Sequence, residues 1–283
     1  MAKSVWTSSP SQLLRADDGF TLADVDPAST PGFDGGKKDG VAALAAGREP
    51  LRELQERLWA ESRFGGTRSL LLVIQAMDTA GKGGIVEHVT GGITPEGLAV
   101  YAFKKPTQEE LAHDFLWRVR KQLPGAGYVG VFDRSHYEDV LIGRVRSLAP
   151  AAEIESRYER IVEFERELVA AGTTIVKVML HISADEQKAR LEARLDDPAK
   201  QWKFNPGDLD ERAFWPQYQE AYQVAIERTS TDDAPWHVVP ANAKWYARAA
   251  VQQLLLDALG GLKLDWPVVD YDVEEQKARL AAS

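Results

Sequence analysis

Apolar runs of strand length alternate with amphipathic segments along most of the chain. Five such runs are bounded by turn-forming residues: Leu72–Ala76, Leu98–Phe103, Tyr128–Phe132, Thr173–Ile182 and Trp236–Val239. The stretches between them carry charged residues at helical spacing; in Ile154–Leu168, one face holds Ile154, Tyr158, Ile161 and Leu168. Strands that alternate with helices predict a parallel sheet that is covered on both faces.

The helical pattern begins ahead of the first of these strands. From Glu49 onward, Leu51, Leu54 and Leu58 recur at helical spacing and predict an amphipathic helix. The residues before it are rich in Asp, Gly, Pro and Ser, and residues 31–40 contain several turn formers without periodicity. We therefore expect residues 1–47 to form an extended arm that wraps around the rest of the chain.

Composition narrows the class of protein. The 283 residues are 44% hydrophobic and 27% charged, and no stretch approaches the roughly 20 apolar residues of a membrane span. The first ten residues lack the apolar core of a secretory signal, and cysteine is absent, so we expect a cytoplasmic protein without disulfides. The net charge of −9 argues against general attraction to polyanions, and we expect neither a membrane nor a nucleic acid as a partner.

The segment that follows the first strand indicates a phosphate-binding loop. It reads Ala-Met-Asp-Thr-Ala-Gly-Lys-Gly-Gly over residues 76–84, an altered form of the P-loop pattern Gly, four residues, Gly-Lys-Ser/Thr. Ala76 replaces the first glycine, and Gly83 replaces the hydroxyl residue that normally holds magnesium. A bare Gly-Lys-Gly-Gly is often only a flexible turn, but a position between strand and helix favours phosphate binding by Lys82 and by the backbone of Ala80, Gly81, Gly83 and Gly84.

A second candidate site lies where the third predicted strand ends. Asp133 follows this strand and is expected at the carboxyl edge of the sheet, where open α/β sheets bind ligands. Magnesium bound to phosphates needs only one or two protein carboxylates, which Asp133 can supply. Arg134 can clamp phosphate oxygens with two hydrogen bonds. The alternative is a surface ion pair between neighbouring residues.

Residues 191–212 combine basic residues with Asp-Pro and Pro-Gly breaks. This composition predicts a hinged helical segment that would serve as a lid in a phosphotransferase and would exclude water when it closes. The alternative is a surface helix that carries basic residues without a ligand. The lid cations expected on phosphates are Arg194, Lys200, Lys203 and Arg212.

The order of these motifs resembles the family-2 polyphosphate kinases, which are similar to thymidylate-kinase-type P-loop proteins. The resemblance extends from about Phe20 to about Leu259 and rests on residues 76–84, Phe103–Thr107, His113–Arg118, Phe132–Leu141 and the lid. It implies an α/β P-loop kinase with a parallel five-stranded sheet, flanking helices and a helical lid. The kinase domain would span residues 48–262, with the lid at about 184–212 and a C-terminal tail at 263–283. Ala76, and Asn205 in place of the usual lid serine, are mild departures.

The resemblance also implies a reaction and roles for residues. The reaction is reversible phosphoryl transfer between inorganic polyphosphate and a nucleoside mono- or diphosphate, converting AMP or ADP to ADP or ATP, with Mg²⁺ or alternatively Mn²⁺. Asp78 and Asp133 would bind the metal, and Asp78 would also orient the attacking nucleotide phosphate. The implied catalytic residues are Asp78, Lys82, Asp133 and Arg134; Arg118 would bind phosphate, and the polyphosphate channel would hold Lys104, Lys105, Arg194, Lys200, Lys203 and Arg212. A homodimer or homotetramer is expected.

Two other function classes remain open at this point. An ATP-dependent nucleoside monophosphate kinase could use the same scaffold, although the missing loop hydroxyl and the extra Asp78 argue against it. A P-loop switch that hydrolyses nucleotide slowly is less favoured, because Asn242–Trp245 does not match the guanine-reading pattern Asn-Lys-x-Asp.

Overall fold

A parallel β-sheet forms the centre of the computed structural model, which describes residues 5–283; residues 1–4 of the predicted arm lie outside the described residues. The five strands have the order β2-β3-β1-β4-β5, and every neighbouring pair is parallel. Their bounds are β1 Ser69–Ala76, β2 Leu98–Ala102, β3 Val129–Asp133, β4 Thr173–His181 and β5 Trp236–Pro240. The predicted parallel five-stranded sheet flanked by helices is confirmed.

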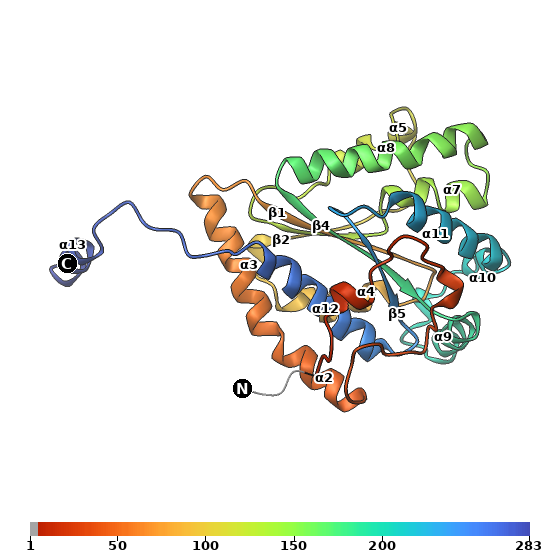
Figure 1. Ribbon diagram of the computed structural model, residues 1–283, viewed down its shortest axis with the longest axis horizontal. Helices are drawn as coiled ribbons and strands as arrows, with labels where there is room; N and C mark the ends of the chain where they lie inside the picture. The colour runs from red at the N-terminus through yellow and green to blue at the C-terminus, as the bar shows by residue number, and fades with distance from the viewer. Residues whose placement is uncertain (1–4) are drawn as a thin grey trace.

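Helices cover both faces of this sheet, as Figure 1 shows: α8 and α11 lie over one face and α3, α4 and α12 over the other. The two faces are set by alternation along β1, where Leu70, Leu72 and Ile74 belong to one hydrophobic cluster and Leu71 and Val73 to the other. The helices are α1 Pro10–Leu13, α2 Lys37–Ala46, α3 Arg48–Arg63, α4 Lys82–His88, α5 Gln108–Leu111, α6 Trp117–Arg120, α7 Ile142–Val145, α8 Ala151–Ala170, α9 Ala184–Asp196, α10 Gly207–Arg212, α11 Trp215–Thr229, α12 Lys244–Gly261 and α13 Val273–Ala281.

The N-terminal segment corrects one part of the prediction. It is not extended throughout, because α2 forms over Lys37–Ala46 despite Gly40 and a weak apolar pattern. The helix is fixed by tertiary contact: Leu44 is buried in the core, and Gly40 faces the Trp245 ring so closely that a methyl group there would overlap it. Packing against α12 therefore outweighs the low local helix propensity.

The earlier part of the same segment covers one edge of the sheet. The Ala16 amide donates to the Trp236 carbonyl and the Val238 amide donates to the Leu14 carbonyl, each at 2.8 Å, so the chain pairs with β5 in an antiparallel way. This pairing satisfies backbone groups that an edge strand would otherwise leave open.

The lid segment and the tail leave the central layers. Residues 184–212 contain α9, a 3₁₀ turn η5 over Gln201–Lys203, and α10. The C-terminal residues extend away from the body and end in α13 (Figure 1). No helix among residues 5–283 is both long and apolar enough to cross a bilayer.

Candidate phosphate-binding site

The loop between β1 and α4 has the backbone shape of a tight anion-binding turn. Two of its residues adopt left-handed backbone angles, Thr79 with φ 66° and Gly81 with φ 119°. Glycine adopts this region readily, whereas threonine does so at a cost that is usual at functional sites. At Gly83 an added Cβ would meet no atom within 4 Å, so no steric reason excludes a hydroxyl residue at that position.

Three charged side chains meet at this loop. The Lys82 ammonium donates to the Ala76 carbonyl (3.0 Å) and lies 3.9 Å from Asp78 Oδ1. Arg134 Nη2 donates to the same carboxylate oxygen at 2.6 Å. Burial of Asp78 would raise its pKa, but Lys82, Arg134 and Arg194 together hold that pKa below its usual value. Asp78 is therefore an anion at neutral pH, held between cations.

The end of β3 places Arg134 opposite the loop. Ile74 of β1 pairs with Asp133, and the Arg134 amide donates to the Ile74 carbonyl at 3.0 Å. Arg134 itself has a left-handed backbone angle, φ 64°. Glu138 lies one 3₁₀ turn further on, in η4 (His136–Asp139). Burial raises the pKa of Glu138 above its usual value, although Arg134 acts in the opposite direction.

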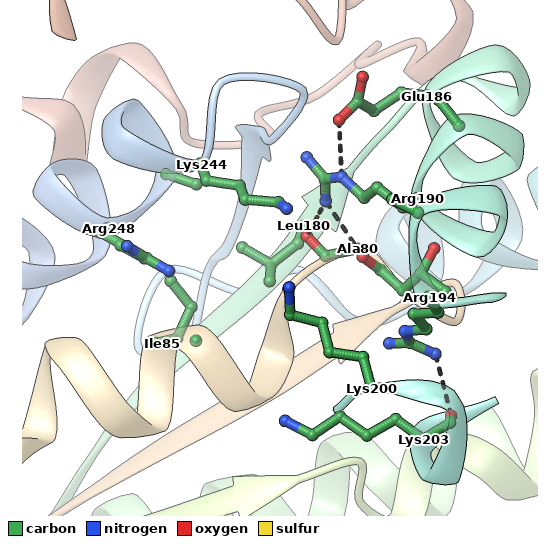
Figure 2. Close-up of a pocket in the computed structure, with 16 residues that line it drawn as sticks. Ala80, Ile85, Leu180, Glu186, Arg190, Arg194, Lys200, Lys203, Lys244 and Arg248 are labelled. Atoms are coloured by element: carbon green, nitrogen blue, oxygen red, sulfur yellow. Dashed lines mark hydrogen bonds and ion pairs between the residues drawn. The ribbon is translucent and has the colours of Figure 1, made fainter. Parts of the chain in front are cut away.

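A cationic cavity of about 510 Å³ opens beside the loop. Figure 2 shows the side chains of Lys200, Lys203, Lys244 and Arg248 reaching into one space from the lid and from α12. Arg194 also lines this cavity and donates to the Lys203 carbonyl at 3.3 Å. Lys244 and Arg248 were not predicted from the sequence; they lie on α12, far along the chain from the loop that they face.

Arg190 fixes the loop to the lid and to the end of β5. Its guanidinium is buried and donates to the carbonyls of Thr79 (3.1 Å) and Ala80 (2.7 Å) on the loop. It also donates to the carbonyls of Ala241 (2.6 Å) and Asn242 (3.0 Å). These hydrogen bonds fix the loop carbonyls against α9. Arg190 was also missed, since a single arginine in a basic helix gives no signal of its own.

Two smaller cavities follow the cationic cavity in space, and each shares lining residues with the one before it. A loop cavity of about 440 Å³ is lined by Asp78, Lys82, Asp133, Arg134, Lys203 and other residues, and it shares Arg194 and Lys203 with the cationic cavity. A tyrosine cavity of about 240 Å³ shares Asp78 and Arg134 with the loop cavity. Its lining includes Met77, Glu138, Leu141, Ile142, Tyr218 and Tyr222. The loop thus separates a cationic space from one that combines apolar and aromatic side chains with the carboxylates of Asp78, Glu138, Asp208 and Glu211.

Four predicted site residues lie outside these three cavities. Lys104 and Lys105 are exposed on the loop after β2. Arg118 is buried; it donates to the Lys104 carbonyl (2.8 Å) and its guanidinium lies 5.3 Å from the centre of the Phe103 ring. Arg212 donates to the Ala184 carbonyl (2.6 Å) and so joins the two lid helices. Their predicted roles on phosphate stay predictions.

The remaining predicted residues are brought together. Ala80, Gly81 and Gly84 line the cationic cavity, and Gly83 lines the loop cavity. Asp78 and Asp133 both face the loop cavity, which suits Mg²⁺, since this ion takes one or two carboxylates and completes its shell with water and phosphate oxygens. Within residues 5–283 no cluster of three or more His, Asp or Glu side chains is arranged to hold a metal.

Comparison with known proteins identifies the family. The family model for Polyphosphate kinase 2 (PPK2) matches residues 36–265. The chain belongs to the polyphosphate kinase 2 family. Among PPK2 relatives, the AMP/ADP-polyphosphate phosphotransferase of Meiothermus ruber is 48% identical over 254 residues, which cover 90% of this chain and 94% of that protein. The ADP-polyphosphate phosphotransferase of Rhodopseudomonas palustris is 44% identical over 231 residues, covering 77% and 78%.

A solved PPK2 structure also matches the whole chain. The crystal structure of polyphosphate kinase 2 from Arthrobacter aurescens TC1 is 62% identical in sequence, with a TM-score of 0.98 and full coverage of both chains. The family resemblance inferred from motif order is therefore confirmed, and so is the P-loop kinase fold.

Proposed function

We propose that this chain transfers phosphoryl groups reversibly between inorganic polyphosphate and nucleoside mono- or diphosphates. The observation that carries the proposal is the cationic cavity, which holds lysines and arginines from α9, η5 and α12 and is lined in part by the phosphate-binding loop. A chain of phosphates requires repeated cations along its path. The names of the PPK2 relatives, which specify polyphosphate with AMP or ADP, support the same reaction.

The two sides of the loop are suited to the two substrates. Polyphosphate would lie along Lys200, Lys203, Lys244 and Arg248, with its terminal group at the loop. The acceptor nucleotide would enter from the tyrosine cavity, where Met77, Leu141 and Ile142 offer apolar contacts to a base and the polar side chains of the lining offer hydrogen-bond partners. The transferred group would then pass between the cavities at the loop, where both substrates approach in line.

The charges at the loop match what phosphoryl transfer requires of a protein. The reaction depends mainly on positioning and on neutralising the oxygens of the transferred group. Lys82, Arg134 and Arg194 would neutralise these oxygens, and Lys82 would have to release the Ala76 carbonyl to do so. Closure of the lid over the loop cavity would exclude water and limit hydrolysis.

Asp78 and Asp133 would hold Mg²⁺, or alternatively Mn²⁺, in the loop cavity. The bound ion would supply charge neutralisation for the phosphate oxygens. Asp78 also accepts a hydrogen bond from Arg134 at 2.6 Å. Arg134 would have to turn from this carboxylate in order to bind a phosphate oxygen of the substrate.

The donor decides between this function and its alternative. The purified protein is incubated with Mg²⁺, polyphosphate and either AMP or ADP, without ATP, and nucleotide products are separated by ion-exchange chromatography. We expect ADP or ATP to form. Formation of ADP from AMP only when ATP replaces polyphosphate would instead establish an ATP-dependent nucleoside monophosphate kinase, which the names of the relatives do not favour.

We also propose that the protein is a cytoplasmic homodimer or homotetramer. The cellular location is supported by the chemistry of its substrates, and the assembly by the family resemblance. Light scattering on the eluate of a size-exclusion column measures the mass directly; a mass near 31.3 kDa would show a monomer and overturn the proposed assembly.

A further inference from the structure

An ion pair is buried in the core on the α8 side of the sheet, away from the three cavities. Lys177 of β4 and Glu165 of α8 are joined at 2.6 Å, and each side chain is at most 3% exposed. The Lys177 ammonium also donates to the Thr229 carbonyl (2.7 Å) and to the Tyr137 hydroxyl (3.0 Å). Tyr137 in turn donates to Glu165 Oε1 at 2.8 Å and lies 3.0 Å from Thr229 Oγ1. We call Tyr137, Glu165, Lys177 and Thr229 the buried network.

The network is an inefficient way to stabilise a core. Two charges removed from water carry a desolvation cost that their attraction does not reliably offset, and apolar side chains of similar volume often serve equally well. The surroundings here are apolar: Phe164 and Trp236 are buried in the same hydrophobic cluster as Tyr137. Burial alone would raise the pKa of Glu165, but the adjacent Lys177 ammonium lowers it below its usual value, so the carboxylate is charged. This arrangement suggests a role in geometry rather than in stability.

The buried network holds in place, through Tyr137, the segment that carries Arg134. Tyr137 lies in η4, and only two residues separate it from Arg134. The intervening Ser135 is itself fixed, because its hydroxyl accepts from the Tyr137 amide (3.2 Å) and lies 3.0 Å from the buried Gln75 amide. Arg134 has a left-handed backbone φ of 64°, a conformation that is strained for a residue with a side chain and persists only when surrounding contacts impose it.

We propose that the buried network positions Arg134 for phosphoryl transfer. By anchoring Tyr137 through directional charged hydrogen bonds, it holds the turn between β3 and η4 in the one shape that aims the Arg134 guanidinium at the loop. Tyr137, Glu165 and Lys177 are thus positioning residues, which touch no substrate. Apolar side chains in place of Glu165 and Lys177 would not fix the position of the Tyr137 hydroxyl, so the strained turn between β3 and η4 could relax. This inference rests on the proposed role of Arg134 at the loop.

The test compares variants of the network with variants of Arg134 itself. The double substitution Glu165→Leu with Lys177→Met removes both charges together, and it also removes the Glu165 partner of His136 Nε2 (3.3 Å). We expect the double variant to melt within a few degrees of the parent. We expect its kcat to fall about tenfold to a hundredfold, the range that a misplaced catalytic group produces. KM for polyphosphate should stay close to the parental value, because the cationic cavity contains none of the network residues.

A matched control and a thermodynamic cycle separate positioning from general damage. The control is Glu167→Leu with Arg120→Met, which removes an exposed ion pair (2.8 Å) between α8 and α6 and should leave kcat unchanged. The cycle repeats the network substitution in an Arg134→Lys background. If the network acts through Arg134, the network substitution should lower kcat by no more than about threefold in the Arg134→Lys background. Equal losses of kcat in both backgrounds would overturn the proposal, as would an unchanged kcat in the folded double variant.

Two further measurements keep the proposal decidable. If the double variant does not fold, Tyr137→Phe removes only the hydroxyl and goes through the same cycle with the same criteria. Crystal structures of the parent and the variant then test the geometry without any assay. An Arg134 that keeps its left-handed backbone and its contact with Asp78 in the variant would refute positioning, even if the parent transferred phosphate from another donor.

Discussion

Removal of the Asp78 charge is the sharpest perturbation of the proposed site. Asp78→Asn keeps the shape of the side chain and an oxygen that accepts from Arg134, but it removes the negative charge between two cations. At the 3.9 Å that separates Lys82 from Asp78, two unit charges interact by about 4 kcal/mol when the effective dielectric constant is near 20. Because the Asp78 side chain is 28% exposed, solvent screens this attraction. We take about 3 kcal/mol for the interactions of Asp78 with Lys82 and Arg134 together.

If Asp78 makes interactions of this size with the metal and the substrate in the transition state, after Arg134 has turned to phosphate, kcat should fall about a hundredfold. KM for polyphosphate should not rise, because the loop gains net positive charge. Initial rates of ATP formation from ADP and polyphosphate measure both constants, and thermal melting confirms that the variant is folded. Asp210→Asn, which removes a charge from an exposed position on α10, is the matched control. A folded Asp78→Asn protein with kcat within about threefold of the parent would refute the reasoning.

Three other predictions address the channel, the turn and the loop. Lys203→Ala should raise KM for polyphosphate, increasingly so at low salt, whereas Lys188→Ala on the exposed part of α9 should not; equal KM values for the two variants would remove Lys203 from the channel. Glu138→Gln should raise the melting temperature at about pH 7 and change it little at about pH 4. The pKa of Glu138 is raised in the folded state, so the folded protein binds this proton more tightly than the unfolded chain does. Ionisation of Glu138 at neutral pH therefore opposes folding, and the substitution removes that effect. Melting curves that shift equally at both pH values would contradict this. Gly83→Ala should stabilise α4 by about 0.5 to 1 kcal/mol, since the position is open, while Gly84→Ala should not, because its Cβ would lie 3.1 Å from the Arg248 guanidinium; chemical denaturation compares the two.

Local patterns were sufficient to predict the sheet and most of the loop side of the site. The strands could be found because their apolar runs end at turn residues, and Asp133 could be placed because it follows such a run. The helix at Lys37–Ala46 could not be predicted, since it depends on a glycine packed against Trp245. The local sequence pattern around Gly40 does not indicate its contact with Trp245, which lies more than 200 residues further along the chain.

The missing part of the site has a similar cause. Lys244 and Arg248 reach the cationic cavity only because α12 returns along the sheet beside α4. Arg190 acts through backbone carbonyls, which every residue has and no motif records. The role of Arg118 on phosphate stays a prediction; its side chain is buried beside Phe103 and donates to the Lys104 carbonyl.

The pairing of the N-terminal segment with β5 has a consequence for the order in which the protein is completed. Ser230 donates to the Ala16 carbonyl across 214 residues of sequence. During synthesis this segment must therefore wait for β5, the last strand of the sheet along the chain, before it finds its partner. Until then both that segment and the edge of β5 offer open hydrogen-bonding groups to neighbouring chains. Shortening the N-terminus should thus lower the yield of correctly assembled protein during synthesis.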